Sequence, residues 1–121
     1  MEKKILIVED EKILLNLLKQ KLEREGYEIS IAQDGEKGLE KARKIQPNLI
    51  LLDIIMPKMD GIQFLKRKKR EGEIKDIPVI IISNSGQPAE LNQAQKLGAE
   101  DWLVKTEFNP QEVIKKVKKI I

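Results

Sequence analysis

The run Leu49-Ile50-Leu51-Leu52-Asp53 sets the architecture of this chain. Four consecutive apolar residues leave no polar face, as in a strand that is buried on both sides of a parallel sheet. Residues 5–8 (Ile-Leu-Ile-Val) and 79–82 (Val-Ile-Ile-Ile) have the same character. Weaker patterns in residues 27–32 and 101–104 indicate two further strands. The sequence therefore predicts five strands.

Helical patterns separate these strands. Apolar residues recur at the three- and four-residue spacing of a helix that buries one face. They do so in residues 13–22, 39–42, 62–65, 91–97 and 113–121. Each predicted strand is thus followed by a predicted helix.

Residues that favour helix ends stand at the expected boundaries. Gly26 and Gly98 lie where the first and fourth helices should end in a left-handed residue. Asn109 followed by Pro110 offers an N-cap and a first-turn proline for the last helix, and Glu112 completes a capping-box pattern. These signals support the helix boundaries.

The element order predicts an α/β fold in which a strand–helix unit occurs five times. Right-handed crossovers place helices on both faces of an open parallel sheet. A length of 121 residues fits one domain with one core. We expect a single domain over residues 1–121, with no second domain.

The composition limits the available chemistry. The chain has no cysteine and no histidine, which excludes disulfides, thiolate or imidazole metal sites, and triads built on an imidazole base. The net charge is +3, but acids are interspersed and aromatic residues make up only 3%. Few rings are available for base stacking, so we expect no direct nucleic-acid binding.

No targeting or membrane segment is evident in the sequence. No apolar run approaches the roughly 20 residues that span a bilayer. The first residues lead into four consecutive apolar residues, which is too short for the core of a signal peptide. We expect a cytoplasmic protein without a membrane partner.

Polar residues that could carry chemistry follow the predicted strands. Glu9 and Asp10 follow the first strand, Asp53 the third, Ser83 the fourth and Lys105 the fifth. Ligands of open α/β sheets bind at the carboxyl ends of the strands, so these side chains should converge. Carboxylates about 4 Å apart repel by roughly 4 kcal/mol at an effective dielectric constant of 20. A hard divalent cation, Mg²⁺ or alternatively Mn²⁺, would relieve that repulsion.

The same residue types suit phosphoryl transfer to a carboxylate. A carboxylate that attacks a phosphoryl group must overcome the repulsion between two anions. A divalent cation, an ammonium group and a hydroxyl around the transferring oxygens supply that compensation. The set of residues suggests phosphorylation of an aspartate through an acyl phosphate.

Four blocks of the sequence resemble the signature blocks of the response-regulator receiver domain. They occur in the order and spacing of that family, and the match covers essentially the whole chain. The blocks are Val8-Glu9-Asp10-Glu11, Leu52 to Gly61 (LDIIMPKMDG), Pro78 to Ser83 (PVIIIS) and Gly98 to Lys105 (GAEDWLVK).

The resemblance implies a flavodoxin-like fold with strand order 2-1-3-4-5, the topology of chemotaxis receivers. It implies a stand-alone receiver of a two-component system. The resemblance implies a sensor histidine kinase or a histidine phosphotransfer protein as the phosphodonor. This chain has no histidine, so the donor must be another molecule. An unknown output protein would bind the surface formed by the last two helices and the last strand.

The resemblance also implies roles for individual residues. Asp53 would be the phosphoacceptor, and Ser83 and Lys105 would bind the phosphoryl group. The metal ligands would be Glu9, Asp10, Asp53 and the backbone carbonyl of Ile55. Ser83 and Trp102 would act as the switch residues.

Five positions depart from the usual pattern of the family. Glu9 stands where Asp is frequent, and Ser83 replaces the commoner Thr. Asn84 occupies a position that is usually Ala or Gly. Its larger side chain is expected to narrow access to the phosphoryl group and to change the rates of phosphorylation and hydrolysis. Trp102 replaces a smaller ring. Thr106 replaces a proline that usually follows a cis peptide bond, so the sequence predicts either a trans bond with a shifted lysine or a strained cis bond.

Simpler interpretations exist for several of these residues. Asp10 could serve only as the N-cap of the first helix. Asp34 and Asp60 are expected to cap the second and third helices, with Gly61 allowing close backbone approach. Trp102 could be a half-buried packing residue.

Two basic segments are expected to be solvated helix surfaces. They are the run Lys66-Arg67-Lys68-Lys69-Arg70 and the lysines of the last helix, Lys115, Lys116, Lys118 and Lys119. The second set lies on the expected partner surface, so a basic partner surface there is a hypothesis.

Three other functions remain possible on this sequence. One is a pseudo-receiver that is not phosphorylated and acts as a protein-interaction module. Another is a hydrolase with an aspartate nucleophile, although the short loops leave no evident substrate pocket. The third, a nucleotide-binding fold, lacks a glycine-rich phosphate loop after the first strand.

Overall fold

The computed structural model describes residues 2–56, 58–83, 88–105 and 109–121. Five strands and five helices alternate along them, as the sequence predicts. The elements are β1 (Lys4–Val8), α1 (Lys12–Arg24), β2 (Glu28–Ala32), α2 (Gly35–Ile45), β3 (Leu49–Asp53), α3 (Gly61–Lys69), β4 (Val79–Ser83), α4 (Pro88–Lys96), β5 (Ala99–Val104) and α5 (Pro110–Ile120).

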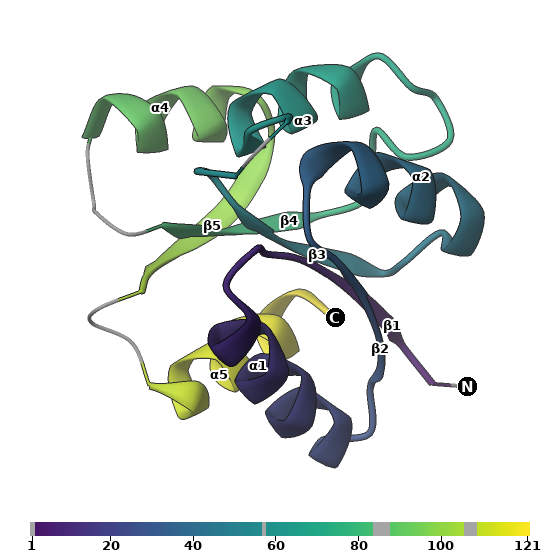
Figure 1. Cartoon of the computed structure of the whole chain (residues 1–121), viewed down its shortest axis with the longest axis vertical. Helices are drawn as coiled ribbons and strands as arrows, with labels where there is room; N and C mark the ends of the chain where they lie inside the picture. The colour runs from purple at the N-terminus through teal and green to yellow at the C-terminus, as the bar shows by residue number, and fades with distance from the viewer. Residues whose placement is uncertain (1, 57, 84–87, 106–108) are drawn as a thin grey trace.

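The strands form one parallel sheet in the order β2-β1-β3-β4-β5 (Figure 1). This is the flavodoxin-like arrangement, and it confirms the predicted strand order. The register places Val8 beside Leu52, Asp53 beside Ile82, and Ser83 beside Val104. The carboxyl ends of the four strands that precede the predicted site residues are therefore aligned at one edge of the sheet.

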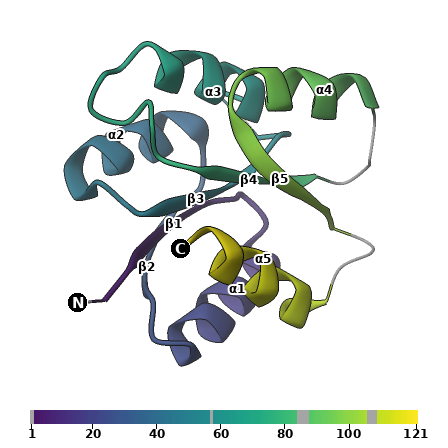
Figure 2. The same cartoon turned by 180° about the vertical axis from the view of Figure 1, so that it is seen from behind.

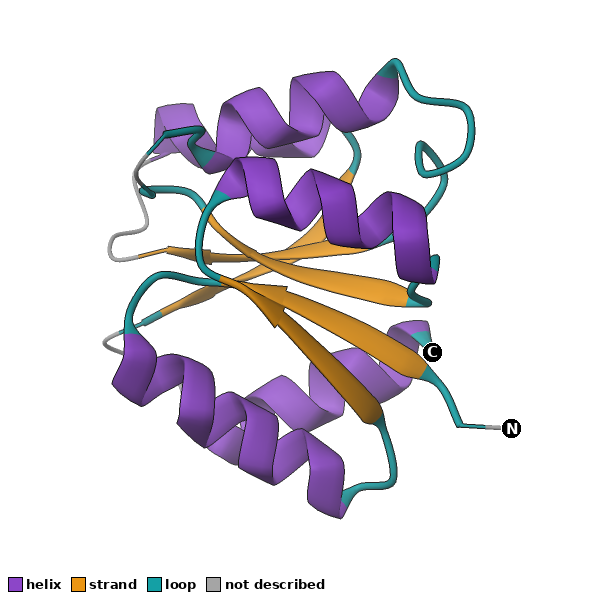
Figure 3. Ribbon diagram, turned by 45° about the vertical axis from the view of Figure 1, so that its right-hand side comes forward, coloured by secondary structure: helices purple, strands orange, loops and turns teal. Residues whose placement is uncertain are grey.

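Helices cover both faces of the sheet. Helices α1 and α5 lie on one face, and α2, α3 and α4 lie on the other, as the opposite views show (Figures 1 and 2). The side view shows the resulting three layers (Figure 3). This arrangement explains why three of the strands read as unbroken apolar runs.

Alternate residues of each central strand enter different cores. Ile5 and Ile7 pack with α1 and α5, whereas Leu6 and Val8 pack with the helices of the other face. In β3, Leu49 and Leu51 join the first core, and Ile50 and Leu52 join the second. All of these side chains have an exposed fraction of 0%. Burial of an aliphatic side chain of this size contributes roughly 1.5–3 kcal/mol.

The helix ends follow the predicted signals. Gly26 and Gly98 have φ values of +94° and +102°, a region that glycine occupies without steric cost. The side chains of Asp34 and Asn109 accept hydrogen bonds from the third residue of α2 and α5, respectively. At α3, Asp60 forms a full capping box with Gln63.

Gly61 fixes the start of α3 against the end of β3. A Cβ atom at this position would lie 2.5 Å from the carbonyl oxygen of Asp53 and 2.7 Å from Cα of Ile54. The N–H of Gly61 donates a hydrogen bond of 2.7 Å to the carbonyl of Ile54. The close approach that the sequence suggested is therefore present, and it holds the segment directly after Asp53.

Among the residues that the structure describes, no helix is both long enough and apolar enough to cross a membrane.

Candidate functional site

Three carboxylates meet at the carboxyl edge of the sheet. Each of Glu9, Asp10 and Asp53 contributes one oxygen, and these oxygens lie within 4.8 Å of one another. Glu9 and Asp53 have exposed fractions of 0% and 2%, whereas Asp10 is exposed. Two buried acids and one solvent-facing acid thus form an open cluster.

Lys105 joins the two buried carboxylates from the end of β5. Its Nζ lies 3.0 Å from Oε1 of Glu9 and 3.1 Å from Oδ2 of Asp53, and 3.4 Å from Oε1 of Glu11. The backbone N–H of Lys105 donates a 2.6 Å hydrogen bond to the carbonyl of Ser83, which fixes the base of the side chain. The ammonium group is the principal positive charge within the cluster.

Burial shifts the pKa values of Glu9, Asp53 and Lys105. Desolvation raises the pKa of Glu9 to about 7, against the lowering effect of the Glu11 N–H and of Lys105. Desolvation also raises the pKa of Asp53, although Lys105 opposes this. Burial disfavours the charge on Lys105, but its hydrogen bonds to both carboxylates together raise its pKa. Lys105 therefore stays charged. Its single positive charge does not fully offset the cost of burying the two carboxylates in their ionised form.

The residues present fit a divalent cation. Oε1 of Glu9 is buried and accepts no hydrogen bond from the described residues, although the Lys105 ammonium lies near it. Among the described residues, the N–H of Ile55 approaches Oδ1 of Asp53 at 3.4 Å, which is long for a hydrogen bond. An all-oxygen set of three carboxylates with free lone pairs matches the preference of Mg²⁺. Coordination by the Ile55 carbonyl stays a prediction.

Ser83 lies on β4, the strand next to that of Asp53, and Trp102 lies on β5, the strand beyond it. Ser83 ends β4 and has an exposed fraction of 3%. Trp102 pairs with Ile81 in the β4–β5 ladder, and its exposed fraction is 42%. The indole is thus partly accessible to a partner, and a packing role for its buried part is not contradicted. The expectations for Asn84 and for the peptide bond before Thr106 fall outside the described residues.

Asp10 does not cap the first helix. The N-cap of α1 is Glu11, which makes no side-chain capping hydrogen bond. The simpler interpretation of Asp10 was therefore wrong, and its carboxylate is available to the cluster. Sequence reasoning gave no role to Glu11, which contacts Lys105 and donates its N–H to Oε2 of Glu9 at 2.9 Å. Its place in the acidic run after β1 was the available signal.

The basic segments are only partly solvated surfaces. Lys68 has an exposed fraction of 5%, and its Nζ donates a 2.9 Å hydrogen bond to the carbonyl of Lys75. Burial lowers the pKa of Lys68. In α5, Lys116 pairs with Asp101 at 2.8 Å, and Lys118 pairs with Glu25 at 2.7 Å. The prediction of a solvated helix surface was wrong for Lys68, because its long side chain reaches across the turn after α3.

Comparison with known proteins agrees with the fold and the site. The family model of the response regulator receiver domain matches residues 5–118. The chain belongs to this family. Receiver domains are modules of two-component signalling that take phosphoryl groups from histidine kinases, and the acidic cluster of this receiver lies at the expected phosphorylation site. The receiver is a signalling module and not a classical enzyme.

Curated relatives are longer than this receiver. The alkaline phosphatase synthesis transcriptional regulatory protein PhoP of Bacillus subtilis is 38% identical over 121 residues, which are 100% of this chain and 49% of PhoP. The transcriptional regulatory protein ResD of the same organism is 38% identical over 99% of this chain and 48% of ResD. The chain thus spans about half the length of these relatives.

Solved receivers have the same fold over their whole length. The chemotaxis protein CheY4 of Vibrio cholerae matches with a TM-score of 0.93 and 30% identity, covering 100% of both chains. A CheY-like receiver from Methanospirillum hungatei matches with a TM-score of 0.88 and 33% identity, over 98% of this chain and 93% of that one. The receiver domain of the sensor histidine kinase PA1611 from Pseudomonas aeruginosa, with magnesium coordinated in its active-site cleft, has a TM-score of 0.89 at 21% identity, over 99% and 98%. That last likeness concerns the fold alone.

Proposed function

We propose that this receiver accepts a phosphoryl group on Asp53 from a sensor histidine kinase or a histidine phosphotransfer protein, with Mg²⁺ bound, and thereby switches a protein-binding surface. One observation carries the proposal. The buried Asp53 carboxylate lies beside two other acids and 3.1 Å from the Lys105 ammonium. A nucleophile and its charge compensation are therefore already assembled.

The reaction requires an in-line displacement at phosphorus. An oxygen of Asp53 attacks the phosphorus of the donor phosphohistidine, the P–N bond breaks, and its electron pair returns to the imidazole of the donor. The product on this chain is an acyl phosphate. Asp53 holds its position because Gly61 packs against its backbone and Ile55 lies beside its Oδ1.

The charges in the site serve this step. Glu9, Asp10 and Asp53 would hold the cation, whose charge would offset that of the phosphoryl oxygens when it is bound. The Lys105 ammonium has three N–H donors, so it could donate a hydrogen bond to a phosphoryl oxygen while it still contacts the carboxylates. Ser83 stands at the end of the neighbouring strand, where its hydroxyl could reach a second oxygen.

The same residues connect the site to a surface. Ser83 and Trp102 lie on adjacent strands, and Trp102 is exposed on β5 between α4 and α5 in the chain. Contact between Ser83 and the phosphoryl group would shift a pre-existing equilibrium between an inactive and an active form of this surface. Binding of the output protein to α4, β5 and α5 would then depend on phosphorylation. The lysines of α5 offer that partner a basic surface.

Intact mass spectrometry tests the proposed reaction. The receiver is incubated with Mg²⁺ and a small acyl-phosphate donor, and the fluorescence of Trp102 is recorded in parallel. The expected result is one added phosphoryl group, which is lost in the Asp53→Asn variant and after chelation of Mg²⁺. A folded, Mg²⁺-binding protein that gains no mass would instead be a receiver that acts only by protein binding. Rapid turnover of a chromogenic phosphate ester would indicate the hydrolase.

A further inference from the structure

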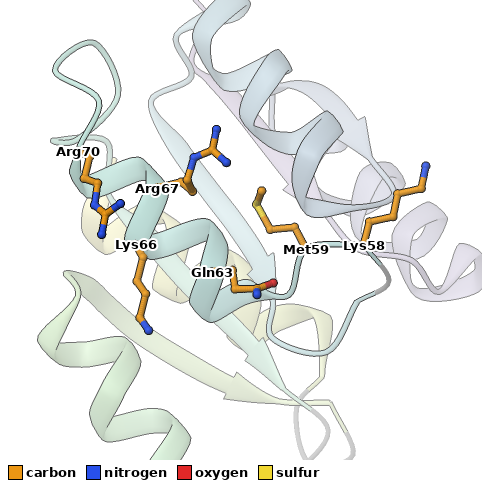
Figure 4. A pocket seen from close by; sticks show the side chains of 6 residues that line it. All are labelled: Lys58, Met59, Gln63, Lys66, Arg67 and Arg70. Atoms are coloured by element: carbon orange, nitrogen blue, oxygen red, sulfur yellow. The ribbon is translucent and has the colours of Figure 1, made fainter.

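A basic groove lies along α3, on the sheet face opposite to α1 and α5. Its volume is about 330 Å³, and it is lined by Lys58, Met59, Gln63, Lys66, Arg67 and Arg70 (Figure 4). Four of these six residues are cationic, and none is acidic. We call this set the α3 groove.

The helical spacing produces this arrangement. Gln63, Lys66, Arg67 and Arg70 follow one another at intervals of three, one and three residues, so they share one side of the helix. Between the first and last of them the helix rises by about 10 Å. Lys68, within the same basic run, points instead into the protein and is buried. The run is therefore divided between the interior and an exposed cationic stripe.

Lys66, Arg67 and Arg70 form no ion pair within the part of the chain that the structure describes, although the charge of Arg67 acts on nearby Glu71. Lys58, at the other end of the groove, lies 4.0 Å from Asp34. No carboxylate among the described residues lies within 4.0 Å of the charged groups of Lys66, Arg67 or Arg70. By contrast, the nearby cation Arg43 on α2 is paired, because its guanidinium donates two hydrogen bonds to the carboxylate of Glu71 at 2.5 and 2.9 Å. The stripe thus keeps its positive charge available for another molecule.

The shape of the groove favours an extended ligand. The charged ends of Lys58, Lys66, Arg67 and Arg70 lie at separate points along α3 and the preceding loop, and do not converge on one centre (Figure 4). Such a distribution suits several separated negative charges better than a single small anion. Met59, with an exposed fraction of 9%, adds an apolar contact to the groove.

The surroundings favour a peptide over a nucleic acid. None of the lining residues is aromatic, so no ring is available for a base. The adjoining hollow contains Asp34, Glu36 and Glu40, which would repel the continuous charge of a phosphate backbone. A peptide can place neutral or basic residues opposite these acids and keep its carboxylates opposite the stripe.

We propose that the α3 groove is a docking surface for an acidic segment of a partner protein. Charge complementarity carries this assignment. The surface lies on the α2–α4 side of the sheet (Figures 1 and 2). None of the residues that line the groove belongs to the acidic cluster, so we expect docking not to require the phosphorylation proposed above.

Fluorescence anisotropy with a short labelled peptide tests this surface. The peptide carries glutamate at every third or fourth position, and the same peptide with glutamine serves as the uncharged probe. The triple variant Lys66→Gln, Arg67→Gln, Arg70→Gln should bind the glutamate peptide at least about tenfold more weakly. The triple variant Lys3→Gln, Lys12→Gln, Arg24→Gln removes the same charge from exposed cations outside the groove and outside the α4–β5–α5 surface, and it should retain binding.

The possible outcomes separate the alternatives. Equal losses in both triple variants, or no binding of the glutamate peptide by the parent, would overturn the proposal. Tighter, α3-dependent binding of a single-stranded RNA of the same length would also overturn it. Circular dichroism and Asp53 phosphorylation verify that each variant folds. The Asp53→Asn variant should bind the peptide normally, which separates this surface from the phosphoacceptor function.

Discussion

Lys105 Nζ lies 3.1 Å from Oδ2 of Asp53, although the two residues are 52 positions apart in the sequence. The contact joins the ends of β3 and β5, which flank β4 in the sheet. It places a fixed positive charge against the proposed phosphoacceptor before any donor arrives. Preorganised charge of this kind is the main way in which proteins stabilise phosphoryl transfer.

Replacement of Lys105 by methionine should slow phosphorylation without preventing cation binding. Loss of one preorganised donor to a developing charge costs about 10²-fold or more in rate. Mg²⁺ affinity should not fall, because the substitution removes a positive charge from the cluster. Rates of mass gain and calorimetric titration with Mg²⁺ measure the two effects, with the exposed Lys115→Met as the control. An unchanged rate would remove Lys105 from the mechanism.

Replacement of Asp10 by alanine distinguishes a metal ligand from a helix cap. Because α1 has Glu11 as its N-cap, the stability of the metal-free protein should change by no more than about 0.5 kcal/mol. Mg²⁺ binding should weaken by about tenfold or more, since a charged ligand is lost. The matched variant Asp34→Ala removes a true cap and should cost about 1 kcal/mol. The opposite pattern in urea denaturation would restore Asp10 as a cap.

Gly61→Ala should distort the site through the backbone. The added Cβ would lie 2.5 Å from the carbonyl oxygen of Asp53, so the start of α3 must shift, at a cost of about 1–3 kcal/mol. Phosphorylation should slow as well. Gly72→Ala is the matched control, because nothing lies within 4 Å of the new Cβ. Equal effects of the two substitutions on the melting temperature and the phosphorylation rate would contradict this role of Gly61.

The stability of the metal-free protein should decrease as the pH rises from about 4.5 to about 7. The pKa of Glu9 is about 7 in the folded state, against an ordinary value of 4.5 for a glutamate, so the folded state binds more protons in this interval. Asp53 acts in the same direction. Thermal melts in the presence of a chelator measure the trend. Glu9→Gln should flatten it, and Mg²⁺ should oppose it, because the cation binds the deprotonated acids. A stability that rises with pH in the chelated parent would contradict the assignment.

The fold could be predicted because its determinants are local. The apolar runs in β1, β3 and β4 show burial on both faces, and Gly26 and Gly98 mark helix ends through a backbone conformation that few other residues adopt. The acidic cluster could also be predicted, because the carboxyl ends of parallel strands meet at one edge of the sheet and bring the residues that follow them together.

Other features depend on long-range packing and could not be predicted. The burial of Lys68 requires the carbonyl of Lys75 to lie within reach of its ammonium. The contact between Glu11 and Lys105 depends on how the chain turns after β1. The division of the basic run into a buried lysine and an exposed stripe emerged only once the neighbours of α3 were placed.

Borohydride trapping tests the central claim most directly. The receiver is incubated with Mg²⁺ and an acyl-phosphate donor and treated with borohydride, which reduces an aspartyl phosphate to homoserine. Peptide mass mapping then locates the change. The account predicts homoserine at position 53 alone, and none without Mg²⁺. Homoserine at position 10, or at no position in a folded protein that binds Mg²⁺, would contradict the assignment of Asp53 as the phosphoacceptor.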